Sequence, residues 1–444
     1  MSTVPQVTTS SGPSESSSLV PHHSLRPFIL VTALFFLWGI PHNLNDVLIR
    51  QFMKSFSLTR LEAGLVQSAF YMGYFLLAVP AGLLMKRFGY KAGILLGLVL
   101  FACGDFLFYP AALAGKYSFF LFALFVIASG LAFLETAANP FIAQLGPQHE
   151  SERRLNFSQA FNPLGSITGV VAGTLFIFSG VELSNAQVSS MQSAGTYTAY
   201  LRTETLRVVT PYLVLGGVAL VMAVLIATTK FPVLAGEPSD KRIPTTRPRG
   251  IAKRLGPAVF AQFMYVGAQV GTWSYFITYV QDSVHLPEKS AGHLLSLTLA
   301  AFLVGRFSTS YLMKFIEPSR LMLVYCIVNV LLVSCGIALH NWTGVVAILM
   351  TSFFMAPMFP TIFAMGIKGL GAATKTAGSI LVMSVIGGAI WTPVMGWIAM
   401  RSHSIAAAYQ IPLYGYLCIA LMVMLIRKSD TTDLESSYNG ATLR

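Results

Sequence analysis

The chain has 444 residues, of which 55% are hydrophobic and only 10% are charged, and its mean hydropathy is +0.67. Soluble globular domains carry about 25% charged residues, so this composition excludes a soluble enzyme or binding domain and indicates a polytopic membrane protein. The net charge of +12 does not indicate nucleic-acid binding, because the basic residues are scattered in short loops between apolar segments.

The N-terminal stretch 1–25 is polar and rich in Ser, Thr and Pro, which predicts a disordered tail without the apolar core of a signal peptide. The four cysteines all lie inside apolar segments: Cys103, Cys326, Cys335 and Cys418. Their positions predict neither a disulfide framework nor a metal site.

Twelve apolar segments follow, each near the length of about 20 residues that a bilayer core requires. They predict an all-α membrane protein with transmembrane helices at about 27–48, 62–85, 92–114, 118–144, 155–179, 207–229, 257–281, 291–313, 321–340, 343–367, 375–400 and 405–426. A polar linker at 231–256 divides them into halves at 26–230 and 257–427, followed by a tail at 428–444. Leu84-Met85-Lys86 recurs as Leu312-Met313-Lys314 at the matching place, which favours two pseudo-symmetric halves of six helices.

The basic residues predict the orientation. Of the 29 Lys and Arg residues, 20 fall on the side of both termini and the linker, eight fall on the other side, and Arg306 lies within a segment. Since Lys and Arg concentrate in cytoplasmic loops, we expect a multi-pass protein of the inner, or plasma, membrane with both termini in the cytoplasm.

Glu135 lies in the apolar sequence LAFLETAANPF at 131–141, with Asn139 one helical turn later on the same face. A charged side chain at the centre of a spanning helix costs about 2.5 to 3.5 kcal/mol, so such a residue is by default a functional-site hypothesis. We interpret Glu135 as a proton carrier. The alternative is a permanently protonated structural acid bonded to a neighbouring helix.

The first segment carries a polar cluster in which Asn43 and Asp46 share a helical face, beside His42 and Asn45. Carboxylate and amide groups can pair with sugar hydroxyls, each of which both donates and accepts. The cluster therefore predicts a sugar-binding element. The alternative is that Asp46 only marks the helix end at the interface.

Amide and aromatic side chains recur at helical spacing in two further segments. The set consists of Gln159, Asn162, Gln262, Tyr265, Gln269 and Trp273. Together with Asn139 they predict a shared polar cavity, in which Trp273 or Tyr265 stacks on the sugar ring. The alternatives are interhelical hydrogen bonds of about 0.6 kcal/mol each, and aromatic packing.

Two further charges lie inside segments. Asp105 either titrates or only hydrogen-bonds within the bundle. Arg306 either neutralises a carboxylate or extends toward an interface.

Four motifs resemble the fucose-galactose-glucose:proton symporter branch of the major facilitator superfamily, and the likeness covers about 27–427. The motifs are NLND at 43–46, QSAFYMGY at 67–74, LETAANPF at 134–141 and PTIFAMGIKGLG at 360–371. The resemblance implies alternating access, an acid on the first helix that engages sugar and an acid on the fourth that takes the proton. These roles fall on Asp46 and Glu135, and the helices with Gln159, Asn162, Gln262 and Gln269 would complete the sugar site.

Three departures from the family pattern affect this reading. Lys86 replaces the acid of the inner-loop signature at 82–91, which removes the ion pair or cap that the acid would make. His42 replaces an amide, and Met358-Phe359 replace a Gln-Tyr pair, so the sugar could differ from L-fucose.

We therefore predict a proton-coupled importer of L-fucose or a related hexose that works as a monomer in lipid. The proton is the coupling ion, and we expect Glu135 and Asp46 to be the residues that couple it to transport. We expect no cofactor, metal, nucleic-acid partner or enzymatic activity, since the eight histidines show no catalytic or ligand spacing. The alternatives are a D-glucose or D-galactose symporter of the same family and an uncoupled sugar facilitator.

Overall fold

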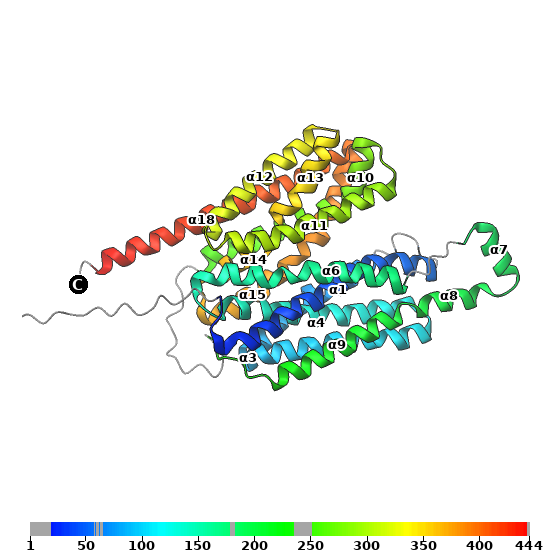
Figure 1. The fold of residues 1–444 in the computed structure, drawn as a ribbon, viewed down its shortest axis with the longest axis horizontal. Coiled ribbons are helices and arrows are strands. Elements are labelled where there is room, and N and C mark those ends of the chain that lie inside the picture. Colours follow the sequence, from blue (N-terminus) through cyan, green and yellow to red (C-terminus); the bar gives the residue numbers. More distant parts are fainter. Residues whose placement is uncertain are drawn as a thin grey trace, which may run out of the picture.

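The computed structural model describes residues 19–56, 58, 62, 65–177, 183–234 and 251–441. Residues 1–18 of the predicted N-terminal tail and most of the predicted linker lie outside these ranges, whereas the end of the tail is helical from His22. The described residues form helices joined by short connections, arranged as two bundles (Figure 1).

The first bundle contains the helices up to α9. They are η1 (His22–Ser24), α1 (Leu25–Phe56), α3 (Leu65–Ala114), α4 (Tyr117–Gln144), η2 (Gln148–Glu150), α5 (Ser151–Gln159), α6 (Phe161–Ala172), the π-helical turn η3 (Gly173–Ile177), α7 (Asn185–Ser193), α8 (Tyr197–Leu206) and α9 (Val209–Thr228).

The second bundle contains the remaining helices. They are α10 (Ile251–Val284), α11 (Glu288–Leu312), α12 (Pro318–Ala338), α13 (Trp342–Met355), α14 (Met358–Ile367), η4 (Gly371–Ala373), α15 (Thr374–Met383), η5 (Ser384–Ile386), α16 (Gly387–Ser402), α17 (Ile405–Ala408) and α18 (Gln410–Ala441). The last helix continues through the predicted C-terminal tail as far as Ala441.

Ten helical stretches among the described residues are long and apolar enough to cross a membrane. One of them, α3, is 50 residues long and turns at Gly89, whose φ of 83° is accessible to glycine, so it makes two passes. The 34-residue α10 supplies another pass by its length. The twelve predicted helices are therefore confirmed, although the second and third are continuous through the bend.

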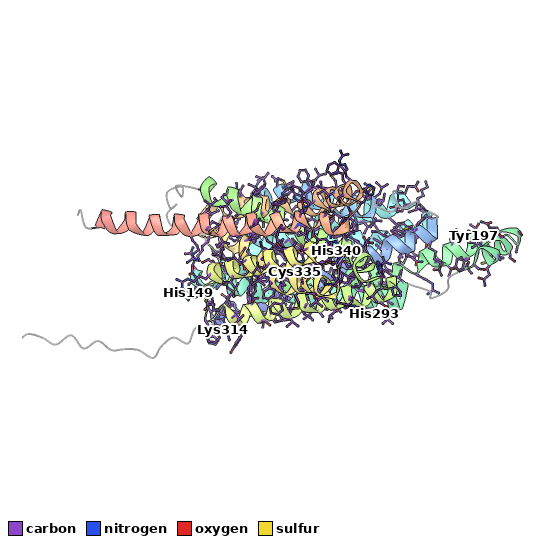
Figure 2. The ribbon with its side chains drawn as sticks, turned by 90° about the horizontal axis from the view of Figure 1, so that it is seen from above. His149, Tyr197, His293, Lys314, Cys335 and His340 are labelled. Atoms are coloured by element: carbon purple, nitrogen blue, oxygen red, sulfur yellow. The ribbon has the colours of Figure 1, made fainter. Side chains whose placement is uncertain are left out.

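Figure 1 shows both bundles running along one long axis. The end where α1 begins and α18 finishes is called the termini end here, and the opposite end, from which α7 and α8 project, is called the far end. The bundles contact each other at the termini end through α14 and α15 and diverge toward the far end. Figure 2 shows His149 and Lys314 at the termini end and Tyr197 at the tip of the projection.

Close backbone contact fixes α1 against α6. A side chain at Gly165 would collide with the carbonyl oxygen of Phe36, and one at Gly169 with that of Ile40. Small residues allow membrane helices to approach closely, where van der Waals packing replaces the hydrophobic effect. This contact places the polar part of α1 beside α6 in the first bundle.

Candidate functional site

Glu135 lies on α4, with 7% of its surface exposed, in a stretch of that helix that is buried throughout. The Tyr74 hydroxyl, on α3, donates a hydrogen bond of 3.1 Å to the Glu135 Oε1 atom. The Tyr74 ring in turn contacts the His42 imidazole of α1, with ring centroids 5.8 Å apart. The carboxyl group is thus held by a neighbouring helix while it remains inside the protein.

A chain of hydrogen bonds begins one turn further along α4. The Gln159 Nε2 atom donates to the Asn139 Oδ1 atom over 2.8 Å. The Arg306 guanidinium, from α11 of the other bundle, donates to the Gln159 Oε1 atom over 2.9 Å and to its backbone oxygen over 3.1 Å. The site therefore joins α4, α5 and α11 across the two bundles.

Arg306 is 4% exposed and has no carboxylate within ion-pair distance among the described residues. Its guanidinium lies over the Phe302 ring, 4.9 Å from the centroid, and interacts electrostatically with the Tyr265 hydroxyl. Among the described residues the side chain pairs with no acid, and its burial does not fit the predicted extension toward an interface; pairing with an acid whose side chain lies outside the described residues stays a prediction. It is instead a buried cation at the contact of the bundles.

Residues of the predicted stripe on α10 complete this side of the site. Tyr265 and Gln262 are fully buried, and Gln269 and Trp273 are partly exposed. The Trp273 Nε1 atom donates to the Ser352 Oγ atom over 3.1 Å. The Trp273 ring meets the Phe302 ring edge-on at a centroid distance of 5.0 Å, so Trp273 joins the cluster through Phe302.

Several buried polar atoms of this region have no hydrogen-bond partner within the described part of the chain. They are the Arg306 Nε atom, the Asn139 Nδ2 atom, the Tyr265 hydroxyl and both amide atoms of Gln262. Buried polar groups are normally paired, and each one left unpaired calls for a specific explanation. Buried donors and acceptors without protein partners are suited to a small polar ligand.

Other predicted residues are placed differently. The Asn162 Nδ2 atom donates to the Phe35 backbone oxygen over 3.3 Å and so connects α6 to α1. Asn43 and Asp46 lie on α1, but their side chains fall outside the described residues. Their predicted contact with a sugar stays a prediction.

Asp105 lies apart from the cluster, where α3 packs on α9. It is fully buried, both of its carboxyl oxygens lack hydrogen-bond partners, and its Cβ atom lies beside Gly216. Tyr212, whose hydroxyl is also unpartnered, interacts with Asp105 electrostatically and stacks on Phe108. The predicted hydrogen bond within the bundle is therefore wrong for the described residues.

The inner-loop signature at 82–91 keeps a structural role without its acid. Lys86 is exposed, whereas the Lys91 Nζ atom donates to the backbone oxygens of Ala227 and Thr229 at the end of α9, over 2.7 and 2.9 Å. Gly82 packs directly on Ser379 of α15 in the other bundle. The signature thus contributes a helix cap and a close contact between the bundles.

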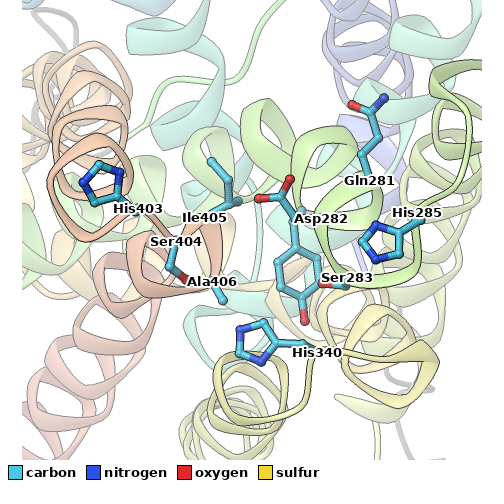
Figure 3. A pocket seen from close by; sticks show the side chains of 10 residues that line it. Gln281, Asp282, Ser283, His285, His340, His403, Ser404, Ile405 and Ala406 are labelled. Atoms are coloured by element: carbon cyan, nitrogen blue, oxygen red, sulfur yellow. The ribbon is translucent and has the colours of Figure 1, made fainter.

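A separate hollow of about 450 Å³ lies at the far end of the second bundle. Figure 3 shows His285, His340 and His403 around it, one from each of the three connections that follow α10, α12 and α16, with Asp282 between them. None of its lining residues belongs to the cluster around Glu135. We therefore do not place the functional site in this hollow.

Sequence comparison identifies the family. A sequence profile of the Major Facilitator Superfamily matches residues 28–392. The chain belongs to the Major Facilitator Superfamily. The predicted resemblance to the fucose-galactose-glucose:proton symporter branch is confirmed by the relatives described next.

Several relatives are sugar transporters by name. The chain is 41% identical to the L-fucose-proton symporter of Escherichia coli K12, and the match covers 90% of this chain and 92% of that symporter. It is 34% identical to the glucose/galactose transporter of Brucella abortus, and the match covers 90% of this chain and 93% of that transporter. It superposes with a TM-score of 0.83 and 40% identity on the superfamily transporter FucP crystallised in the outward conformation, over 91% of this chain and 99% of that one.

Sequence reasoning missed two features of the site. Tyr74 falls within a motif that carried the resemblance, but its hydroxyl was not assigned to Glu135. Arg306 was recognised as a buried charge, but the side chain that it bonds among the described residues is an amide and not a carboxylate. A hydroxyl and a lone cation inside otherwise apolar helices were the available signals.

Proposed function

We propose that this chain is a proton-coupled L-fucose importer of the inner membrane that functions as a monomer. The observation that carries the proposal is the position of Glu135, a buried acid bonded to Tyr74, one helical turn before the chain from Asn139 to Arg306. A titratable group and several unpaired buried polar atoms thus lie in the region where residues of the two bundles meet.

The proposed cycle uses this arrangement for alternating access. Glu135 takes a proton from the outside, and the sugar binds between the bundles against Asn139, Gln159 and the α10 stripe. The bundles then rock, and sugar and proton leave on the other side. Asn43 and Asp46 on α1 are proposed to complete the sugar site, and Asn162 to support it through its bond to α1.

The excess of Lys and Arg supports an orientation with the termini end in the cytoplasm. The far end, with α7 and α8, would then face the outside. The end toward which the bundles diverge would then be the side from which an importer takes its substrate (Figure 1).

A second candidate substrate is D-glucose or D-galactose. The relatives include glucose/galactose transporters at 34% identity. The His42 imidazole packs against Phe70 and Tyr74, and the Phe359 ring lies 6.3 Å from that of Tyr265, so two of the three departures from the family pattern lie close to the site. L-Fucose remains the first choice because two named L-fucose-proton symporters are among the relatives.

The experiment that tests the function is a pH trace. De-energised cells that express the protein are suspended in weak buffer, and L-fucose, D-galactose or D-glucose is added separately. Alkalinisation of the medium with one sugar would establish proton symport and identify the substrate. Entry of radiolabelled sugar without a pH change would refute symport and leave an uncoupled facilitator.

A further inference from the structure

Three polar side chains form a stripe along α5, the short helix that ends at the site. Glu152, Asn156 and Gln159 stand at positions i, i+4 and i+7, which places them on one face. They are 3%, 0% and 5% exposed, so this face is buried although α5 is polar in sequence. A rise of 1.5 Å per residue gives the stripe a length of about 10 Å between the site and the termini end.

Each residue of the stripe is bonded to the opposite bundle. The Lys368 Nζ atom, just after α14, pairs with the Glu152 Oε1 atom over 2.9 Å. The Asn156 Nδ2 atom donates to the Thr361 Oγ1 atom on α14 over 3.0 Å. Arg306 on α11 donates to Gln159, as described above. One helix of the first bundle therefore holds two helices of the second.

The innermost of these contacts is shared with the site. Gln159 receives Arg306 from the other bundle and at the same time donates to Asn139, one turn after Glu135. A ligand that competes for the Gln159 amide, or a change at Asn139, therefore directly alters the hydrogen bond between Gln159 and Arg306. The two outer contacts, at Asn156 and Glu152, lie outside the cluster of site residues.

We propose that the α5 stripe is the latch that keeps the termini end closed, and that Arg306 is the positioning residue through which the site controls it. This inference rests on the proposed transport function. The inner-loop signature has Lys86 in place of its acid and so cannot make the ion pair that this acid would form. At the termini end, the Glu152–Lys368 pair takes its place. Opening requires Glu152 to leave Lys368 and to be hydrated, so loss of Lys368 leaves a buried unpaired carboxylate and favours the open form.

The test measures access to the termini end in the full-length protein. Ser379, which is 1% exposed and packs on Gly82 between the bundles, is changed to Cys after the four native cysteines are replaced by Ser. The rate of modification by N-ethylmaleimide in membranes then reports opening. Lys368→Met should raise this rate about fivefold or more.

Matched variants separate the latch from general damage. Glu150 pairs with Arg153 over 3.0 Å within the first bundle, so Glu150→Gln should leave the rate unchanged. Thr361→Val, which removes the acceptor for Asn156 at constant shape, should raise it. The exchange Glu152→Lys with Lys368→Glu should restore protection. Arg306→Gln should raise the rate, and Arg306→Lys should recover part of the protection, both with an unchanged melting temperature.

The outcomes distinguish the latch from the proposed function. Unchanged labelling in Lys368→Met and Thr361→Val, in a protein that still takes up sugar, would overturn the latch alone. Faster labelling in these variants, in a protein that transports none of the three sugars, would support the latch and refute sugar transport.

Discussion

Replacing Glu135 by Gln removes the proton-binding group while the surrounding geometry is kept. The Gln carbonyl can accept the Tyr74 hydroxyl bond of 3.1 Å, and the side chain has nearly the same shape. If Glu135 carries the coupling proton, the variant should still bind and exchange sugar. It should lose only the ability to use the membrane potential.

The magnitude of the loss follows from the charge that moves. One elementary charge that crosses the membrane is worth about 2.3 kcal/mol per 100 mV. At about 1.36 kcal/mol per factor of ten, a potential of that size supports roughly 50-fold accumulation. The wild-type protein should approach this ratio at equal pH on both sides, whereas Glu135→Gln should equilibrate sugar without accumulating it.

The assay uses membrane vesicles with a potassium diffusion potential and radiolabelled L-fucose. Accumulation is compared with counterflow in vesicles preloaded with unlabelled sugar, because counterflow needs binding and rocking but no net proton movement. We expect Glu135→Gln to retain counterflow and to lose accumulation. Potential-driven accumulation by Glu135→Gln near the wild-type ratio would refute the role of Glu135 as proton carrier.

Three further predictions concern residues around the site. Asp105→Asn should accumulate sugar as the wild type does in the same vesicles, because Asp105 lies apart from the cluster; loss of accumulation would assign it a part in coupling. Gly165→Leu should destabilise the protein by about 1 to 3 kcal/mol through overpacking against α1, measured by thermal unfolding in detergent, whereas Gly217→Leu, with open space around it, should not. The hydrogen bond from the Ser319 hydroxyl, and to a smaller extent the charges of Arg427 and Arg320, lower the pKa of Glu317 below its ordinary 4.5. The ionised Glu317 side chain therefore stabilises the fold above pH 4.5, and this contribution is lost as the pH falls through the lowered pKa. Since its side chain is half exposed, Glu317→Gln should remove only about 0.2 to 1 kcal/mol of this acid-sensitive stability, and an unchanged acid transition would contradict the assignment.

The candidate site was predictable from sequence to the extent that its residues stand out against apolar helices. Glu135 and Asn139 share a face by their spacing alone, and Gln262 and Tyr265 follow the period of α10. Periodicity identifies the face of one helix but not its partner. The expected cavity residue Asn162 bonds to the α1 backbone instead, because the close crossing of α1 and α6 brings Phe35 within reach.

Composition and spacing by themselves determined that this protein is a twelve-helix membrane protein in two halves, with an acid in the fourth helix. Only the tertiary structure decided which side chains meet. Tyr74 and Glu135 are 61 residues apart, and Gln159 and Arg306 are 147 apart. Such pairs depend on how helices cross and how the bundles are apposed, and the local sequence around either partner carries no record of this. The same reason explains why Asp105, which is also a buried carboxylic acid, lies outside the site.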